Sequence, residues 1–185
     1  MDGFFTSLFT VTLAEIGDKT QLLSLLLTIR FKNKIAIILG ILVATLLNHA
    51  ASAFLGVWLA QFIASIWGQV LLAVSFIALG IWLLVPDQED DMTDNLKYGA
   101  FIVSTVLFFV AEIGDKTQIA TVLLGAQYES IVIVTAGTTL GMLVANIPVV
   151  LGGEKLMQKL PMQWAHRIAA AIFVGFGLLQ LILIS

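Results

Sequence analysis

The sequence contains no cysteine and very little charge. Without cysteine, the chain has no disulfide, no thiolate metal site and no cysteine nucleophile. Charged residues make up 11% of its 185 residues and hydrophobic residues 59%, whereas a soluble domain carries about 25% charged residues. So few charges cannot supply a polar surface. The composition therefore indicates an integral membrane protein, without a soluble domain and without a nucleic-acid partner.

Six apolar stretches are long enough to cross a bilayer, which takes about 20 residues in a helix. They are continuous apolar runs, which favours helices over strands. The first stretch lacks the basic segment that begins a cleaved signal peptide, so we expect it to be retained. We predict an all-α integral membrane fold with six transmembrane helices, at residues 4–29, 35–58, 67–85, 99–126, 131–152 and 165–184.

The basic residues outside two short motifs, described below, all fall on one side of the predicted membrane. By the positive-inside rule this side is cytoplasmic, which places both termini outside. An acidic loop at residues 86–98 also falls on this side. We interpret it as a solvated linker, with attraction of cations to the cytoplasmic mouth as the alternative. The basic residues are Arg30, Lys32, Lys34, Lys97, Lys155, Lys159 and Arg167.

The two halves of the chain are repeats with a constant offset of 97 residues. Gly40 matches Gly137 and Trp67 matches Trp164, without a gap between these pairs. We therefore divide the chain into a first three-helix repeat (1–85), the loop (86–98) and a second three-helix repeat (99–185). Because each repeat has an odd number of spans, the second must be inverted in the membrane. Inverted repeats are typical of secondary transporters, whose site lies where the repeats meet.

One phrase, Ala-Glu-Ile-Gly-Asp-Lys-Thr-Gln, occurs at residues 14–21 and again at 111–118. Each copy lies inside an apolar stretch, where a charge costs several kcal/mol and is usually functional. On a continuous helix the Glu, Asp and Gln of each copy share one face, with the Gly nearly opposite. That Gly either admits a neighbouring helix or weakens its own helix. The predicted oxygen ligands are Glu15, Asp18, Gln21, Glu112, Asp115 and Gln118, a set that suits Ca²⁺, Mg²⁺ or Mn²⁺.

Each motif also contains a lysine and a threonine. Lys19 and Lys116 follow the glutamates by four residues, within reach of them. We expect them to compensate charge, both as ion pairs and as cations that occupy the carboxylates in place of metal. We expect Thr20 and Thr117 to bond backbone carbonyls of their own helices.

Two polar residues occupy equivalent positions in the second and fifth predicted spans. His49 and Asn146 are more often helix-packing residues than ligands, and proton transfer is the alternative for His49. Near Asn146, the small residues Gly137, Gly141 and Ala145 predict a close-packing helix face.

The doubled Glu-x-Gly-Asp-Lys-Thr phrase in a six-span chain resembles uncharacterised protein family 0016. Its members include bacterial manganese exporters and the Golgi and chloroplast Ca²⁺/Mn²⁺–proton antiporters. The resemblance covers essentially the whole chain and includes Gly137–Met142 with Ala145 and Asn146. It implies that Glu15, Asp18, Glu112 and Asp115 bind the transported cation, with Mn²⁺ favoured over Ca²⁺ and protons as the counter-ion. It further implies a bacterial plasma-membrane protein that is not an enzyme, has no bound cofactor and exports from the cytoplasm.

Three other readings of the motifs stay open at this stage. Asp18 and Asp115 could form the pair of an intramembrane aspartyl protease, although a Glu three residues before and a Lys after each Asp suit ion binding better. The chain could also be a passive cation channel, or a structural subunit whose carboxylates serve assembly. A homo-oligomer is compatible with every reading.

Overall fold

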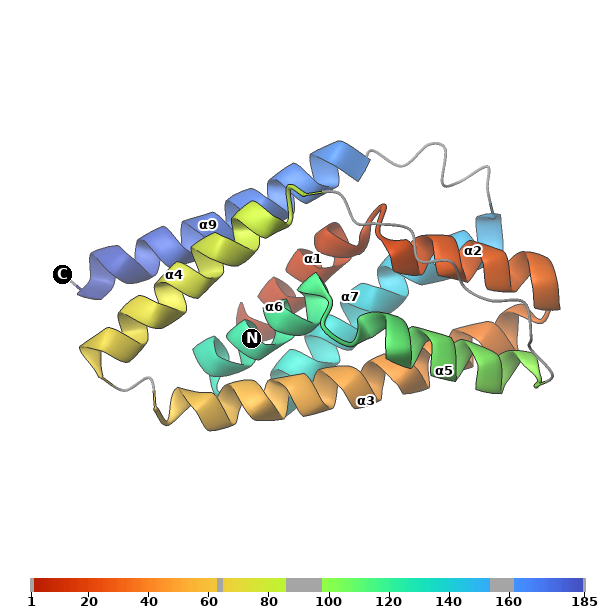
Figure 1. Ribbon diagram of the computed structural model, residues 1–185, viewed down its shortest axis with the longest axis horizontal. Coiled ribbons are helices and arrows are strands. Elements are labelled where there is room, and N and C mark those ends of the chain that lie inside the picture. Colours follow the sequence, from red (N-terminus) through yellow and green to blue (C-terminus); the bar gives the residue numbers. More distant parts are fainter. Residues whose placement is uncertain (1, 63–64, 86–97, 154–161, 185) are drawn as a thin grey trace.

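A computed structural model describes residues 2–62, 65–85, 98–153 and 162–184 (Figure 1). All regular structure in these ranges is helical, which confirms the all-α class. The predicted acidic loop lies outside the described residues, apart from its last position. The described helices are α1 (Asp2–Glu15), α2 (Lys19–Phe31), α3 (Lys34–Ala60), α4 (Ile66–Trp82), α5 (Ala100–Glu112), α6 (Lys116–Tyr128), α7 (Ile131–Gly152) and α9 (Met162–Ile184).

The predicted single helices at 4–29 and 99–126 are wrong. Each stretch is a pair of short helices, α1 with α2 and α5 with α6, because a turn interrupts it inside the motif. Each turn contains a glycine with positive φ, 87° at Gly17 and 76° at Gly114. A residue with a side chain adopts this conformation only at a cost, so the glycine permits the break. Among the described helices, α3, α7 and the part of α9 from Gln163 are long and apolar enough to cross a membrane alone.

Close contacts join the first helix of each half to the third helix of the other half. α7 packs on α1 with Gly137 against the Phe4 carbonyl and Gly141 against the Leu8 carbonyl, which confirms the predicted close-packing face. α3 packs on α5 in the same way, with Gly40 against Ser104. These two contacts are equivalent under the 97-residue offset.

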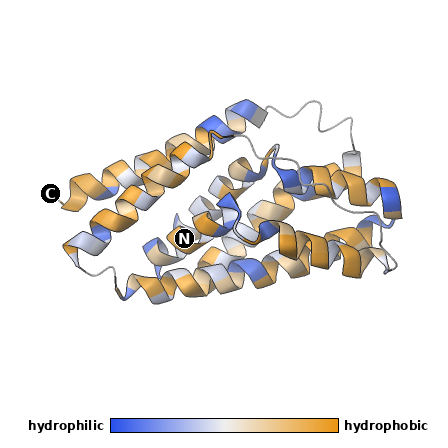
Figure 2. Ribbon diagram, in the orientation of Figure 1, coloured by the Kyte–Doolittle hydropathy of each residue, from blue (hydrophilic) through white to orange (hydrophobic). Residues whose placement is uncertain are grey.

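α4 and α9 lie side by side along one flank of the molecule (Figure 1). Gly80 and Gly177 bring the two backbones together, and the rings of Phe76 and Phe173 stack with centroids 6.0 Å apart. The outer faces of the helices are strongly apolar (Figure 2), with Trp67 as much as 79% exposed. Such an exterior suits lipid rather than water.

Candidate cation site

The glutamine that ends each motif stabilises the turn at the helix break. Asp18 and Asp115 are the N-cap residues of α2 and α6. The Gly17 N–H donates to Gln21 Oε1 at 2.8 Å, and the Gly114 N–H donates to Gln118 Oε1 at 2.7 Å. Each glutamine therefore supplies the acceptor for the glycine N–H of its turn. Both were predicted as metal ligands; their amide oxygens also serve the turn, and the ligand role stays a prediction.

Gln21 makes a second contact that ties its turn to the other half of the chain. Its Nε2 donates to the Ala145 carbonyl oxygen of α7 at 2.8 Å. The side chain is fully buried, so this bond forms in a medium where an unpaired amide is costly. The first motif is thus fixed against the second repeat.

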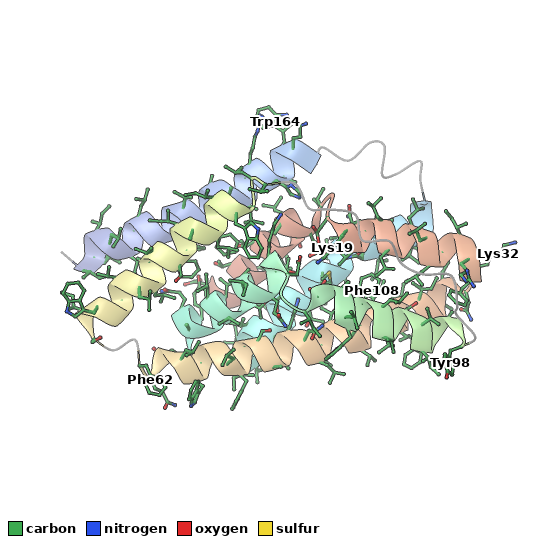
Figure 3. All side chains as sticks on the ribbon, in the orientation of Figure 1. Lys19, Lys32, Phe62, Tyr98, Phe108 and Trp164 are labelled. Carbon is green, nitrogen blue, oxygen red and sulfur yellow. The ribbon has the colours of Figure 1, made fainter. Side chains whose placement is uncertain are left out.

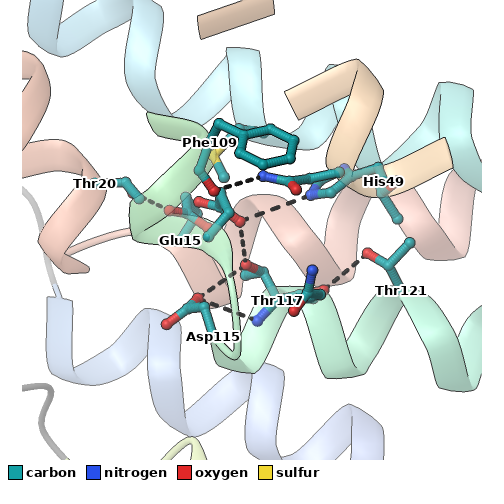
Figure 4. Close-up of polar contacts among 12 residues, drawn as sticks. Glu15, Thr20, His49, Phe109, Asp115, Thr117 and Thr121 are labelled. Atoms are coloured by element: carbon teal, nitrogen blue, oxygen red, sulfur yellow. Dashed lines mark hydrogen bonds and ion pairs between the residues drawn. The ribbon is translucent and has the colours of Figure 1, made fainter. Parts of the chain in front are cut away.

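The threonines bind carboxylates, so the prediction that they bond their own helix carbonyls is wrong. Thr20 Oγ1 donates to Glu15 Oε1. Thr117 Oγ1 lies 3.0 Å from both Glu112 Oε2 and Asp115 Oδ2 (Figure 4). The helix break explains the difference. Each threonine is the second residue of a new helix, so no helical carbonyl lies four residues before it.

The two motifs meet, as the repeat pattern predicted. Lys19 Nζ of the first motif lies 3.1 Å from Asp115 Oδ1 of the second, and Figure 3 shows Lys19 near the middle of the molecule. Glu112 is within electrostatic range of Asp18, Asp115 and Lys19. The sequence predicts that Lys19 pairs with the glutamate of its own motif. The turn instead directs the Lys19 ammonium group to Asp115, the aspartate of the second motif.

The carboxylates are almost completely buried. Glu15 and Glu112 have no exposed surface, Asp18 is 3% exposed and Asp115 5%. Lys116 is also buried, and its Nζ donates to the Val85 carbonyl oxygen at 2.6 Å. In the described part of the chain, no three acidic or histidine side chains stand close enough together to hold a metal ion. The residue types fit a hard divalent cation, and the side chains would have to move to enclose one.

His49 and Asn146, which are equivalent in the two repeats, make different contacts. His49 is fully buried on α3, with Nε2 3.9 Å from Glu112 Oε2 (Figure 4). Asn146 on α7 accepts a hydrogen bond from Ser24 Oγ of α2 at 2.8 Å and does not occupy the same relation to a carboxylate. Asn146 therefore joins helices, whereas His49 lies against the site.

Sequence reasoning missed Ser24 and gave Asn48 no contact of its own. Ser24 is the α2 partner of Asn146, and Asn48 Nδ2 donates to the Phe109 carbonyl oxygen of α5 at 3.0 Å. Both are buried polar residues in apolar helices. That signal could have marked them as interhelical partners, because a buried polar group requires one.

Comparison with known families decides the class of protein. A family model described as "Divalent cation/proton antiporter GDT1" matches residues 3–91 and 100–183. The chain belongs to this family. GDT1 proteins are transporters, which agrees with a buried pair of acidic motifs in apolar helices and favours a protein that is not an enzyme.

Relatives occur in bacteria and plants. A Vibrio cholerae protein named "Putative manganese exporter" is 49% identical over 173 residues, which cover 93% of this chain and 86% of the relative. The "GDT1-like protein sll0615" of Synechocystis is 26% identical, with 97% of each chain covered. The "GDT1-like protein 4" of Oryza sativa subsp. indica is 28% identical over 96% of this chain and 72% of its own length. No solved structure gives a significant match.

Proposed function

We propose that this GDT1 protein exports a divalent cation from the cytoplasm in exchange for protons, with Mn²⁺ as the first candidate and Ca²⁺ as the second. The observation that carries the proposal is the contact between Lys19, which is partly buried, and the buried Asp115, because it joins the two motifs. The name of the Vibrio cholerae relative supports Mn²⁺ and the direction of transport. The transported ion is the substrate, and no resident cofactor is needed.

The carboxylates of the two motifs form the ion site in this proposal. Carboxylate oxygens are the ligands that Mn²⁺ and Ca²⁺ prefer. Asp115 forms an ion pair with Lys19 in the structure, so an arriving cation competes with the Lys19 ammonium group for this carboxylate. The hydroxyl of Thr117 binds both Glu112 and Asp115 and so keeps the two carboxylates near each other. In this proposal both carboxylates rotate toward the ion when it binds.

The proposed architecture is six spans in two inverted repeats, residues 1–85 and 99–185, with α1 plus α2 and α5 plus α6 each forming one span. Broken helices at the substrate site are typical of secondary transporters. The equivalent contacts of Gly40 with Ser104 and of Gly137 with Ser7 support the repeat relation. The one-sided basic residues support external termini and a cytoplasmic 86–98 loop in a bacterial plasma membrane.

Transport into proteoliposomes tests this function. Purified protein is reconstituted, and uptake of Mn²⁺, Ca²⁺ and Mg²⁺ is compared with and without an imposed pH gradient. We expect Mn²⁺ uptake that follows the pH gradient and a simultaneous proton movement in the opposite direction. Divalent flux without any proton movement would support a passive channel instead. Cleavage of a membrane substrate would support the protease reading, which the ion pair of Asp115 with Lys19 already disfavours.

A further inference from the structure

A polar pocket lies at the end of the helix bundle where α3 and α6 end. It has a volume of about 460 Å³, and its polar lining consists of Gln61, Gln69, Gln127, Gln180 and Glu129. These side chains offer oxygen atoms, and among the described residues that line the pocket there is no lysine or arginine. A cation with six waters needs roughly 200 Å³ at about 30 Å³ per water, so the pocket can hold it hydrated.

Directly beside this pocket, the backbones of α3 and α6 are in contact. A Cβ atom added to Gly56 would lie 2.1 Å from the Val122 carbonyl oxygen, and one added to Gly125 would lie 2.7 Å from the Ala53 carbonyl oxygen. Real Cβ atoms do not approach other atoms this closely, so neither position accepts a side chain without movement. The crossing therefore leaves no passage for an ion between the two helices.

The crossing lies between the cation site and the pocket on both helices. Along α3 the order is His49, which lies against Glu112, then Gly56, then Gln61. Along α6 the order is Thr117, Gly125 and Gln127. At 1.5 Å per residue, the crossing is roughly 10–12 Å from the site on each helix.

The equivalent crossing at the other end of the bundle is not made. Subtracting or adding 97 converts Gly125 to Thr28 and Gly56 to Gly153. Thr28 cannot offer the same close approach, and a Cβ on Gly153 would meet no described atom within 4 Å. Among the described residues, close backbone contact at these glycine positions is thus present at the α6 end and absent at the repeat-equivalent positions Thr28 and Gly153.

Repeat-equivalent positions at the two ends of the bundle also differ in charge. The repeat partners of Gln127 and Glu129 are Arg30 and Lys32 at the end of α2. A cation therefore meets amide and carboxylate oxygens at the α6 end, where the equivalent positions of the other end are basic. This difference favours the α6 end as the place where a released cation enters water.

We propose that the crossing at Gly56 and Gly125 is the outer gate of the transport pathway, and that the polar pocket beyond it is a vestibule that receives the hydrated divalent cation. This inference rests on the proposed export function. The gate separates to release the cation and closes again by backbone contact. Four amides and one carboxylate bind a hydrated cation weakly, which permits its loss to the medium.

The charge of the vestibule is tested with cysteine adducts, because the natural chain has no cysteine that could react. Gln180→Cys is modified with two methanethiosulfonate reagents of similar size, one carrying a trimethylammonium group and one a sulfonate. Phe62→Cys is the matched control, since Phe62 is 64% exposed at the same end and points away from the bundle (Figure 3). We expect Mn²⁺ transport about tenfold slower with the cationic adduct than with the anionic one at Gln180→Cys, and equal rates at Phe62→Cys.

The gate is tested by labelling Thr121→Cys, which lies on α6 between the site and Gly125. Thr121 is fully buried, so a membrane-impermeant maleimide added outside should react slowly in the parent. An added methyl in Gly56→Ala or Gly125→Ala opposes closure, and we expect about fivefold faster labelling. Gly175→Ala is the control, because a Cβ there meets nothing within 4 Å. Without any glycine change, labelling should also be faster during Mn²⁺ turnover than in the metal-free protein at rest.

Two results would overturn the inference while transport by the parent is intact. These are equal rates with both adducts at Gln180→Cys, and labelling of Thr121→Cys that is the same at rest and during turnover. If the cysteine-free parent moves no divalent cation against protons, the proposed function has failed instead. The parent measurement therefore separates the two ideas.

Discussion

Lys19 and Asp115 are 96 residues apart in the sequence, and Nζ of one lies 3.1 Å from Oδ1 of the other. Asp115 is only 5% exposed, so this pair is largely withdrawn from water. Removing either partner of a buried pair leaves an uncompensated charge, which is costly. A divalent cation that displaces Lys19 must therefore supply at least as much positive charge to Asp115. In the proposed transport cycle, the pair would therefore couple the occupancy of one motif by a cation to the position of the other motif.

Neutralising a motif glutamate should abolish transport without preventing membrane insertion. Glu15→Gln and Glu112→Gln are nearly isosteric changes of fully buried side chains, and both residues keep an oxygen for their threonine. The charge that attracts the cation is lost, however. Mn²⁺ flux in proteoliposomes and the yield of monodisperse protein are the two measurements. Normal Mn²⁺ flux in either variant would contradict the hypothesis that both motifs form one cation site.

The threonine hydroxyl of each motif should matter for activity. In Thr117→Val, Glu112 and Asp115 lose a common donor, whereas Thr117→Ser retains it. Removing a hydrogen bond to a buried charged group costs about 1.5–3 kcal/mol, which corresponds to about ten- to a hundredfold in an equilibrium. We expect the apparent affinity for Mn²⁺ to fall by such a factor in Thr117→Val, with near-parental affinity in Thr117→Ser. Equal affinities in the two variants would show that the hydroxyl does not organise the site.

The helix break at Gly114 should require its positive φ rather than space. A Cβ there meets nothing within 4 Å, but φ is 76°. Gly114→Ala should therefore destabilise the protein by about 1–2 kcal/mol, and Gly114→Asn by less, since Asn tolerates this conformation better. Gly175→Ala in α9 has open space and ordinary helical φ, so it serves as the control. Thermal unfolding in detergent measures all three variants, and a fully stable Gly114→Ala would contradict the argument.

The sequence predicted the composition of this site better than its shape. Helical class and the position of the motifs follow from apolar length, from repetition and from the cost of buried charge. Repetition favours a shared site as well, but the contact between the motifs is known from the structure. The break at Gly17 and Gly114 does not follow, because a glycine inside an apolar run is compatible with either a continuous or an interrupted helix. The roles of Thr20, Thr117 and Lys19 all depend on that break. The directions in which these three side chains point therefore became known only with the backbone conformation of the two turns.

The orientation in the membrane should be visible with single cysteines. Ser65→Cys and Gln127→Cys should react with an impermeant thiol reagent from outside intact cells, because these positions lie on the side without basic residues. Gln88→Cys, at a position outside the described residues, should react only from the cytoplasmic side. Reaction of Gln88→Cys from outside would reverse the orientation and with it the direction of export.

Exchange should be electroneutral, with one divalent cation moved for two protons. The four motif carboxylates and the two motif lysines, Lys19 and Lys116, give the fully ionised site a net charge of −2. One divalent cation neutralises this charge, and so do two protons. Because an uncompensated buried charge is costly, the neutral forms are the ones expected to change between inward-facing and outward-facing states.

This coupling makes transport respond to the pH gradient and ignore an imposed membrane potential. Lys19→Gln is the informative variant, since removal of one positive charge leaves the metal-bound site at −1 and its return form unbalanced as well. Flux by Lys19→Gln should therefore be slower and should change with voltage, because moving one charge across the membrane is worth about 2.3 kcal/mol per 100 mV. Proteoliposomes with potassium gradients and valinomycin provide the potential at fixed pH. Steep voltage dependence already present in the parent would reject the two-proton stoichiometry and would indicate that a lysine changes its charge during the cycle.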